Sequence, residues 1–68
     1  MKSVSGKELA RILERNGWRL QRVSGSHHVY AKEGNPARIS LPIHGNHPLK
    51  LGLQRHFMKV AGLQDSDL

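Results

Sequence analysis

Residues 18–42 read WRLQRVSGSHHVYAKEGNPARISLP, and in this stretch apolar and polar side chains alternate in three short runs. Alternation with a period of two is typical of a β-strand that buries one face. The pattern predicts strands over residues 18–23, 27–32 and 37–41, separated by segments rich in Gly, Ser, Asn and Pro. Such short connections join antiparallel neighbours, so we expect a three-stranded antiparallel meander.

A helix is predicted before these strands. The segment Ser5–Glu8 has the pattern of a capping box, in which the serine hydroxyl and the glutamate carboxylate each accept from a backbone N–H. Apolar residues then recur at helical spacing, at Leu9, Ile12 and Leu13. Asn16-Gly17 is a stop signal. The first helix is therefore expected to span roughly three turns.

A second helix is predicted after a loop over residues 42–48. One face of this helix is marked by apolar residues, namely Leu49, Leu53, Phe57, Val60 and Ala61. Gly62 ends the helix, and Gly52 weakens its first turn. Residues 63–68 are expected to form a loosely held C-terminal tail.

The expected element order is α-β-β-β-α, which places the chain in the α+β class. Residues 1–68 are short enough for a single domain. Both helices should cover one face of the sheet, because an amphipathic helix and a half-apolar sheet bury their apolar sides against each other. The other face of the sheet is then left to solvent or to a ligand.

The charge balance is strongly basic. Eleven Lys and Arg residues stand against five Asp and Glu, for a formal net charge of +6. Nucleic acid or an acidic protein is the partner that such a surface attracts. Trp18, Tyr30 and Phe57 are the only aromatic residues, so a base-stacking platform is hard to build.

The composition also indicates a compartment. The chain has no cysteine, which fits a reducing environment. No stretch is long and apolar enough to span a bilayer, and the first residues lack the apolar run of a secretion signal. We expect a cytoplasmic protein without membrane attachment that is monomeric when free.

The run Ser24–Tyr30 places two adjacent histidines where a tight turn enters a strand. Histidine moves protons near neutral pH, so it suits acid–base chemistry. Strand alternation puts His27 on one face and His28 on the other. Which of them faces outward stays open at this stage, because a bulge after the turn would shift the register.

Other kinds of catalytic site fit the sequence less well. His27 and His28 with His44 and His47 match no standard zinc-ligand spacing, and no clustered carboxylates suit a two-metal nuclease. Ser26 adjoins His27, but adjacent strand residues face apart and no carboxylate is placed to orient the ring. We expect neither a metal nor a cofactor.

Metal-free RNA cleavage requires fewer positioned groups than these sites do. A base takes the proton of the 2′-OH, cations stabilise the charged phosphorane, and an acid protonates the leaving 5′ oxygen. Candidate phosphate ligands are Lys32 and Arg38 on the strands, with Lys50, Arg55 and Lys59 on or near the second helix.

Four segments of the chain resemble the HicA family of small mRNA interferase toxins. They are Ser5–Leu9 with Asn16–Trp18, Gly25–Tyr30, Leu41–Gly45, and Leu49–Leu53 with Phe57 and Ala61–Leu63. Together they span nearly everything from Ser5 to Leu63. The chain departs from the family at Leu51 and Leu53, which flank Gly52 where a polar or hydroxyl residue is frequent. This departure argues against a phosphate contact at the start of the second helix.

The resemblance implies an α-β-β-β-α fold like that of double-stranded RNA-binding domains. It also implies cleavage of mRNA without the ribosome and neutralisation by a HicB-like antitoxin. The catalytic histidine of the family directly follows Gly-Ser, which corresponds to His27.

We therefore expect the toxin of a type II toxin–antitoxin system, a metal-independent endoribonuclease with His27 as general base or acid. The second proton-transfer group is left open between His28, His44 and a lysine. The main alternative is a non-catalytic RNA-binding module of the same fold, and a third is a domain whose basic face only docks an acidic protein.

Overall fold

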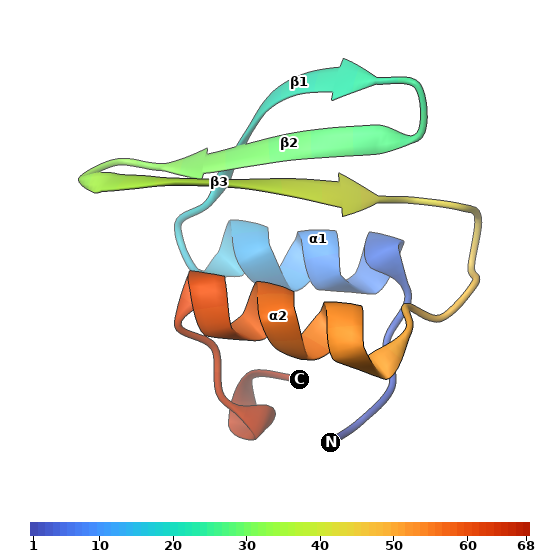
Figure 1. Ribbon diagram of the computed structural model, residues 1–68. Coiled ribbons are helices and arrows are strands. Elements are labelled where there is room, and N and C mark those ends of the chain that lie inside the picture. Colours follow the sequence, from blue (N-terminus) through green and yellow to red (C-terminus); the bar gives the residue numbers. More distant parts are fainter.

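The computed structural model describes all residues 1–68. Its elements are α1 (Gly6–Arg15), β1 (Arg19–Ser24), β2 (His27–Lys32), β3 (Asn35–Pro42), α2 (Leu51–Ala61) and a 3-10 turn, η1 (Asp65–Asp67). The strands form one antiparallel sheet in the order β1-β2-β3, and both helices lie on the same side of it (Figure 1). The predicted α-β-β-β-α order and α+β class are confirmed.

The start of α1 is held by the predicted capping box. The Ser5 hydroxyl accepts from the Glu8 N–H at 3.1 Å, and a Glu8 carboxylate oxygen accepts from the Ser5 N–H at 3.4 Å. The first turn packs against the end of β3, where a Cβ added at Gly6 would collide with the carbonyl oxygen of Pro42. Glycine at this position therefore lets α1 approach the sheet backbone.

The β1–β2 connection is a two-residue turn, Gly25-Ser26, and β1 extends to Ser24. Gly25 has a φ of 58°, whereas Ser26 is not in the positive-φ region. Glycine at the first central position with positive φ is what a type II′ hairpin turn requires. The turn fixes the register in which Ser24 lies opposite His27.

The third strand is longer than expected and begins at Asn35 rather than at residue 37. The Asn35 side-chain oxygen accepts from the Ala37 N–H at 2.9 Å, which stabilises the chain around Pro36. Proline is tolerated there because β3 is an edge strand. The preceding turn is correspondingly reduced to Glu33-Gly34.

The buried face of α2 differs from the predicted one. Leu53 is 38% exposed, whereas Gln54 is fully buried with Phe57 and Met58. Because the helix begins only at Leu51, the buried Leu49 lies outside it and does not set its phase. Placing Leu53 on the buried face was wrong.

Gln54 is buried because it binds the N-terminal segment. Its side-chain oxygen accepts from the Val4 N–H at 3.1 Å, and its amide nitrogen donates to the Lys2 carbonyl at 2.6 Å. The Leu49 N–H donates to the Val4 carbonyl at 2.9 Å. These bonds satisfy a buried polar side chain and fasten the segment before α1 to α2.

The residues after α2 turn back toward the hydrophobic core. The Gln64 N–H donates to an Asp67 carboxylate oxygen at 2.7 Å in η1. Leu63 and Leu68 pack against the hydrophobic core. Because Leu63 and Leu68 are partly buried at the two ends of residues 63–68, this segment folds back onto the core. Neither helix is long and apolar enough to cross a bilayer.

Candidate active site

The two faces of β2 are assigned by burial. Tyr30 is 3% exposed and belongs to the core, so residues of its parity face the helices. The β2–β3 register is unbroken from His27 to Ala31, and the bulge in the β1–β2 pairing puts its extra residue in β1, so β2 itself alternates regularly over these residues. His27 therefore lies on the face away from the helices and is exposed, whereas the half-buried His28 lies on the helix side. The sequence left open which of the two histidines faces outward, and in the structure it is His27.

The sheet face away from the helices, which we call the open face, is built by β2 and its two neighbours. Residues directly opposite each other across antiparallel strands share a face. The open face consists of His27, Val29 and Ala31 with their partners Ser24, Arg22 and Arg19 on β1 and Pro42, Ser40 and Arg38 on β3.

The immediate surroundings of His27 follow from this register. Ser24 and Pro42 lie directly opposite it on the two neighbouring strands. Arg22 and Ser40 are the diagonal neighbours on the same face, at a separation of roughly 7–8 Å. An arginine side chain is long enough to reach a phosphate bound over the imidazole from that distance. The site thus combines an imidazole, two hydroxyls and one cation.

A β-bulge places Arg22 in this site. The register passes from Leu20 opposite Tyr30 to Arg22 opposite Val29, so Gln21 is the extra residue. Simple alternation would put Leu20 and Arg22 on the same face, but the bulge reverses the parity between them. Arg19 and Arg22 consequently share the open face. Sequence reasoning missed both arginines as site residues because no local pattern marks the bulge.

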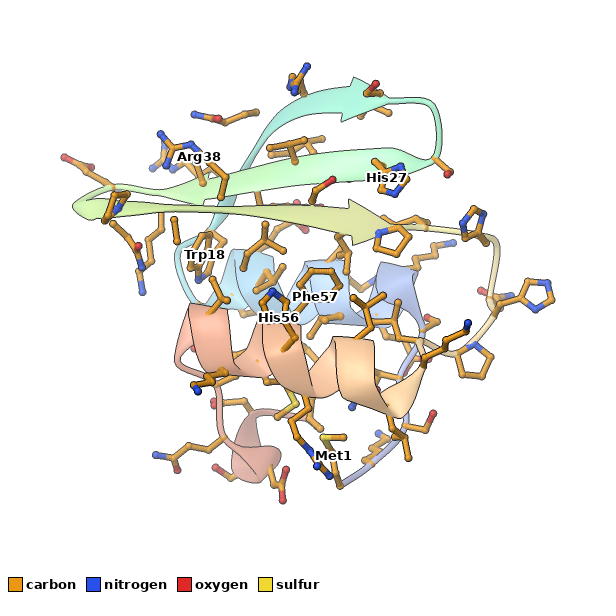
Figure 2. All side chains as sticks on the ribbon, in the orientation of Figure 1. Met1, Trp18, His27, Arg38, His56 and Phe57 are labelled. Carbon is orange, nitrogen blue, oxygen red and sulfur yellow. The ribbon has the colours of Figure 1, made fainter.

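Two of the predicted phosphate ligands lie at the far end of the sheet. Arg38 is four residues along from the partner of His27, about 13 Å away at strand spacing. One of its guanidinium nitrogens, Nη1, donates to the carbonyls of Asn35, Pro36 and Ala37 at 3.1–3.3 Å. His27 and Arg38 are seen at opposite ends of the sheet in Figure 2.

The exposed Lys32 is also far from His27. It ends β2, roughly 17 Å along the strand, and its Cε would lie 3.4 Å from a Cβ added at Gly17. Its side chain is therefore directed to the α1–β1 junction, away from the site.

The cations of α2 are not part of the open face. Arg55 and Lys59 border a surface hollow of about 500 Å³ beside Leu63 and Met1. The helix layer stands between this hollow and the open face, as the arrangement in Figure 1 shows. Lys50 is exposed in the connection just before α2. These three residues and His27 do not form one cluster.

The remaining histidines are placed differently. His44 follows Ile43, whose N–H donates to the Ser26 carbonyl at 2.8 Å, so the loop after β3 starts beside the turn that precedes His27. His28 borders a hollow of about 510 Å³ between α1 and the sheet. No three His, Asp or Glu side chains gather in a way that could hold a metal ion.

Tyr30 belongs to the structural side of the sheet. Burial raises the pKa of its phenol, and the Glu14 carboxylate beside it raises that pKa further. The phenol is therefore neutral near neutral pH and sits on the face opposite His27. No carboxylate residue lies on the open face, since the five acidic residues are on α1, in the Glu33-Gly34 turn and in η1.

A family comparison covers most of the chain. A protein-family model described as the HicA toxin of bacterial toxin–antitoxin systems matches residues 6–63. The matched range runs from the start of α1 to the residue after the α2 C-cap and includes the open face. No curated protein matches the chain.

Proposed function

The chain belongs to the HicA family of bacterial toxins, and on that premise we propose that it is an endoribonuclease that cleaves mRNA without a metal ion. Its role as a toxin carries with it an antitoxin partner, which we propose to be HicB-like. The observation that supports the proposal most is the position of His27, exposed on the open face and flanked by Arg22 across the strand pair.

The proposed reaction is an internal transfer at phosphorus. His27 takes the proton from the ribose 2′-OH, and the 2′ oxygen attacks the adjacent phosphorus. The bond from phosphorus to the 5′ oxygen breaks, and that oxygen leaves with a proton from an acid. The products are a 2′,3′-cyclic phosphate and a 5′-OH. The chemistry needs a base, an acid and a cation, and all three can be protein groups.

His44 is the strongest candidate for the acid. It is one residue beyond the bond between Ile43 and Ser26, at the same end of the sheet as His27. His28 is a weaker candidate, since its side chain emerges on the covered face. Arg22 would stabilise the negative charge that builds up on the phosphorane oxygens.

The RNA path that we propose follows the open face. Arg22 and Arg19 lie along β1, and Arg38 lies at the far end of β3. Lys32 and Lys50 lie outside the cluster around His27 and would contact RNA only beyond the two ends of the sheet. Arg55 and Lys59 would meet only a second stretch of RNA, on the α2 side. Contacts to phosphate give affinity that falls as salt rises.

The test is cleavage of an end-labelled RNA by the purified chain in EDTA. His27→Ala should lower the rate by about 10²–10⁴-fold, the usual contribution of general acid–base catalysis. His56→Ala is the matched control, because His56 is exposed on α2 and should leave the rate unchanged.

Two further readouts complete the experiment. Products should end in 2′,3′-cyclic phosphate, and exclusively 3′-OH ends would contradict the mechanism. If neither wild type nor His27→Ala cleaves, yet both bind RNA equally, the chain is the non-catalytic RNA-binding module instead.

A further inference from the structure

The free edge of β1 carries an unused interaction surface. β1 pairs only with β2, so one row of its backbone N–H and C=O groups has no partner in the sheet. All six residues of β1 are exposed. Neither helix covers this edge in Figure 1.

The other edge of the sheet is protected. β3 contains Pro36 and Pro42, which lack the N–H that an added strand would need. The Arg38 guanidinium occupies three carbonyls of that strand. β1 has no proline and no such side-chain contact, so it is the edge open to pairing.

Two exposed apolar side chains lie on the helix side of β1. Leu20 is 45% and Val23 is 54% exposed. They lie opposite Tyr30 and His28, which both border the hollow between α1 and the sheet. The apolar strip of β1 therefore lies next to two residues that line the hollow, in which the cations Lys7 and Arg11 outnumber the one acid, Glu14.

The opposite face of β1 presents Arg19 and Arg22. A strand added to this edge would meet arginines on one face and Leu20 and Val23 on the other. Like charges directly opposite each other destabilise a strand pair, so a second copy of this chain is disfavoured. A segment with acidic residues on one face and apolar residues on the other is complementary.

We propose that the β1 edge is the docking site of an extended acidic–apolar segment of the antitoxin, which adds a fourth strand to the sheet. The inference rests on the toxin–antitoxin part of the proposed function and is independent of its nuclease part. An RNA strand fits less well, since it has no use for the free backbone edge or for the apolar strip.

The test is a titration of the isotopically labelled full-length chain, without RNA, with a synthetic ten-residue peptide of alternating glutamate and valine. At about 1 mM peptide, where even weak specific binding reaches half saturation, the amide signals of residues 19–24 should shift and their hydrogen exchange should slow. A peptide of alternating lysine and valine should produce neither effect.

Two variants of equal exposure sharpen the test. Val23→Asp should raise the Kd of the glutamate peptide at least about tenfold, because it places a carboxylate where the valines of the peptide would pack. Leu51→Asp is the matched control, since Leu51 is 53% exposed but lies on α2, and its Kd should stay the same.

Several results would overturn the proposal. They are no shift at the highest peptide concentration, shifts centred on the open face or on β3, an equal response to the lysine peptide, or an equal Kd for Val23→Asp. Concentration-dependent shifts of β1 in the chain alone would assign the edge to self-association. A short RNA that shifts residues 19–24 where the peptide does not would assign it to RNA. None of these readouts depends on cleavage, so an inactive nuclease leaves the result interpretable.

Discussion

The two faces of the sheet are made from the same strands but have different roles. On the covered face, Tyr30, Ile39 and Leu41 are at most 3% exposed and belong to the core. On the open face, His27, Arg22 and Ser40 are exposed. The alternation of a strand thus separates the residues that hold the fold from those available for chemistry. A substitution on the covered face should therefore affect stability, and one on the open face should affect activity.

The largest effect is expected for Leu41→Ala on the covered face. Removing this fully buried side chain should cost about 2–5 kcal/mol of unfolding free energy, which approaches the whole stability of a domain of this size. Ser40→Ala, one residue earlier on the open face, should change stability by less than about 0.5 kcal/mol. Urea unfolding followed by Trp18 fluorescence measures both. Equal losses for the two neighbours would break the comparison.

The next effect concerns two helical glycines of opposite environment. Gly6→Ala should destabilise the chain by about 1–3 kcal/mol, because its Cβ would collide with the Pro42 carbonyl and push α1 off the sheet. Gly52→Ala meets nothing within 4 Å and should stabilise by up to about 1 kcal/mol through helix propensity. Thermal unfolding of both variants tests this, and a shift in the same direction for both would contradict it.

The open face is tested next by removing its central cation. Arg22→Gln should slow RNA cleavage by about tenfold, below the effect of losing a buried oxyanion donor because the site is solvated. The salt dependence of RNA binding should weaken by about one phosphate contact. Arg55→Gln on α2 is the matched control and should leave the cleavage rate unchanged. If Arg55→Gln slows cleavage more than Arg22→Gln does, the RNA path lies elsewhere.

The smallest effect is a pH dependence on the covered face. Folding raises the pKa of Tyr30, so the folded state keeps its phenolic proton at a pH where the unfolded chain has begun to lose it. The associated stability is fully present below about pH 10 and is lost as pH rises through the folded pKa. Wild type should therefore lose more stability than Tyr30→Phe between neutral and strongly alkaline pH. Parallel curves for the two proteins would show that Tyr30 contributes nothing.

Local sequence signals predicted the elements well. These signals act over a few residues, so they can be recognised without knowledge of the tertiary fold. They are the capping box at Ser5 and Glu8, the helix stop at Asn16-Gly17 and the turn glycines. Gln54 was not recognised as buried, because only the distant backbone of Lys2 and Val4 gives its side chain a partner.

The candidate site was only partly predictable. His27 directly follows the Gly25-Ser26 turn, which sets the register of β1 and β2, and the Gly-Ser-His motif identified it as the candidate catalytic residue. The face of the sheet on which His27 lies could not be predicted, because alternation does not tell which set of β2 side chains is buried. The burial of Tyr30 in the folded sheet provides that information. Arg22 reaches the open face through the bulge at Gln21, which simple alternation does not reveal. Arg38 shares the open face but lies at its far end, and that position depends on the strand register rather than on a local signal.

The measurement that tests the central claim most directly is the RNA cleavage rate, in EDTA, of His27→Ala beside His28→Ala, each corrected for its folded fraction. The two imidazoles are neighbours in sequence but lie on opposite faces. We expect His27→Ala to lose at least about 10²-fold in rate and His28→Ala to stay within a few-fold of wild type. Loss of cleavage in His28→Ala with retention in His27→Ala would place the chemistry on the covered side and contradict the account.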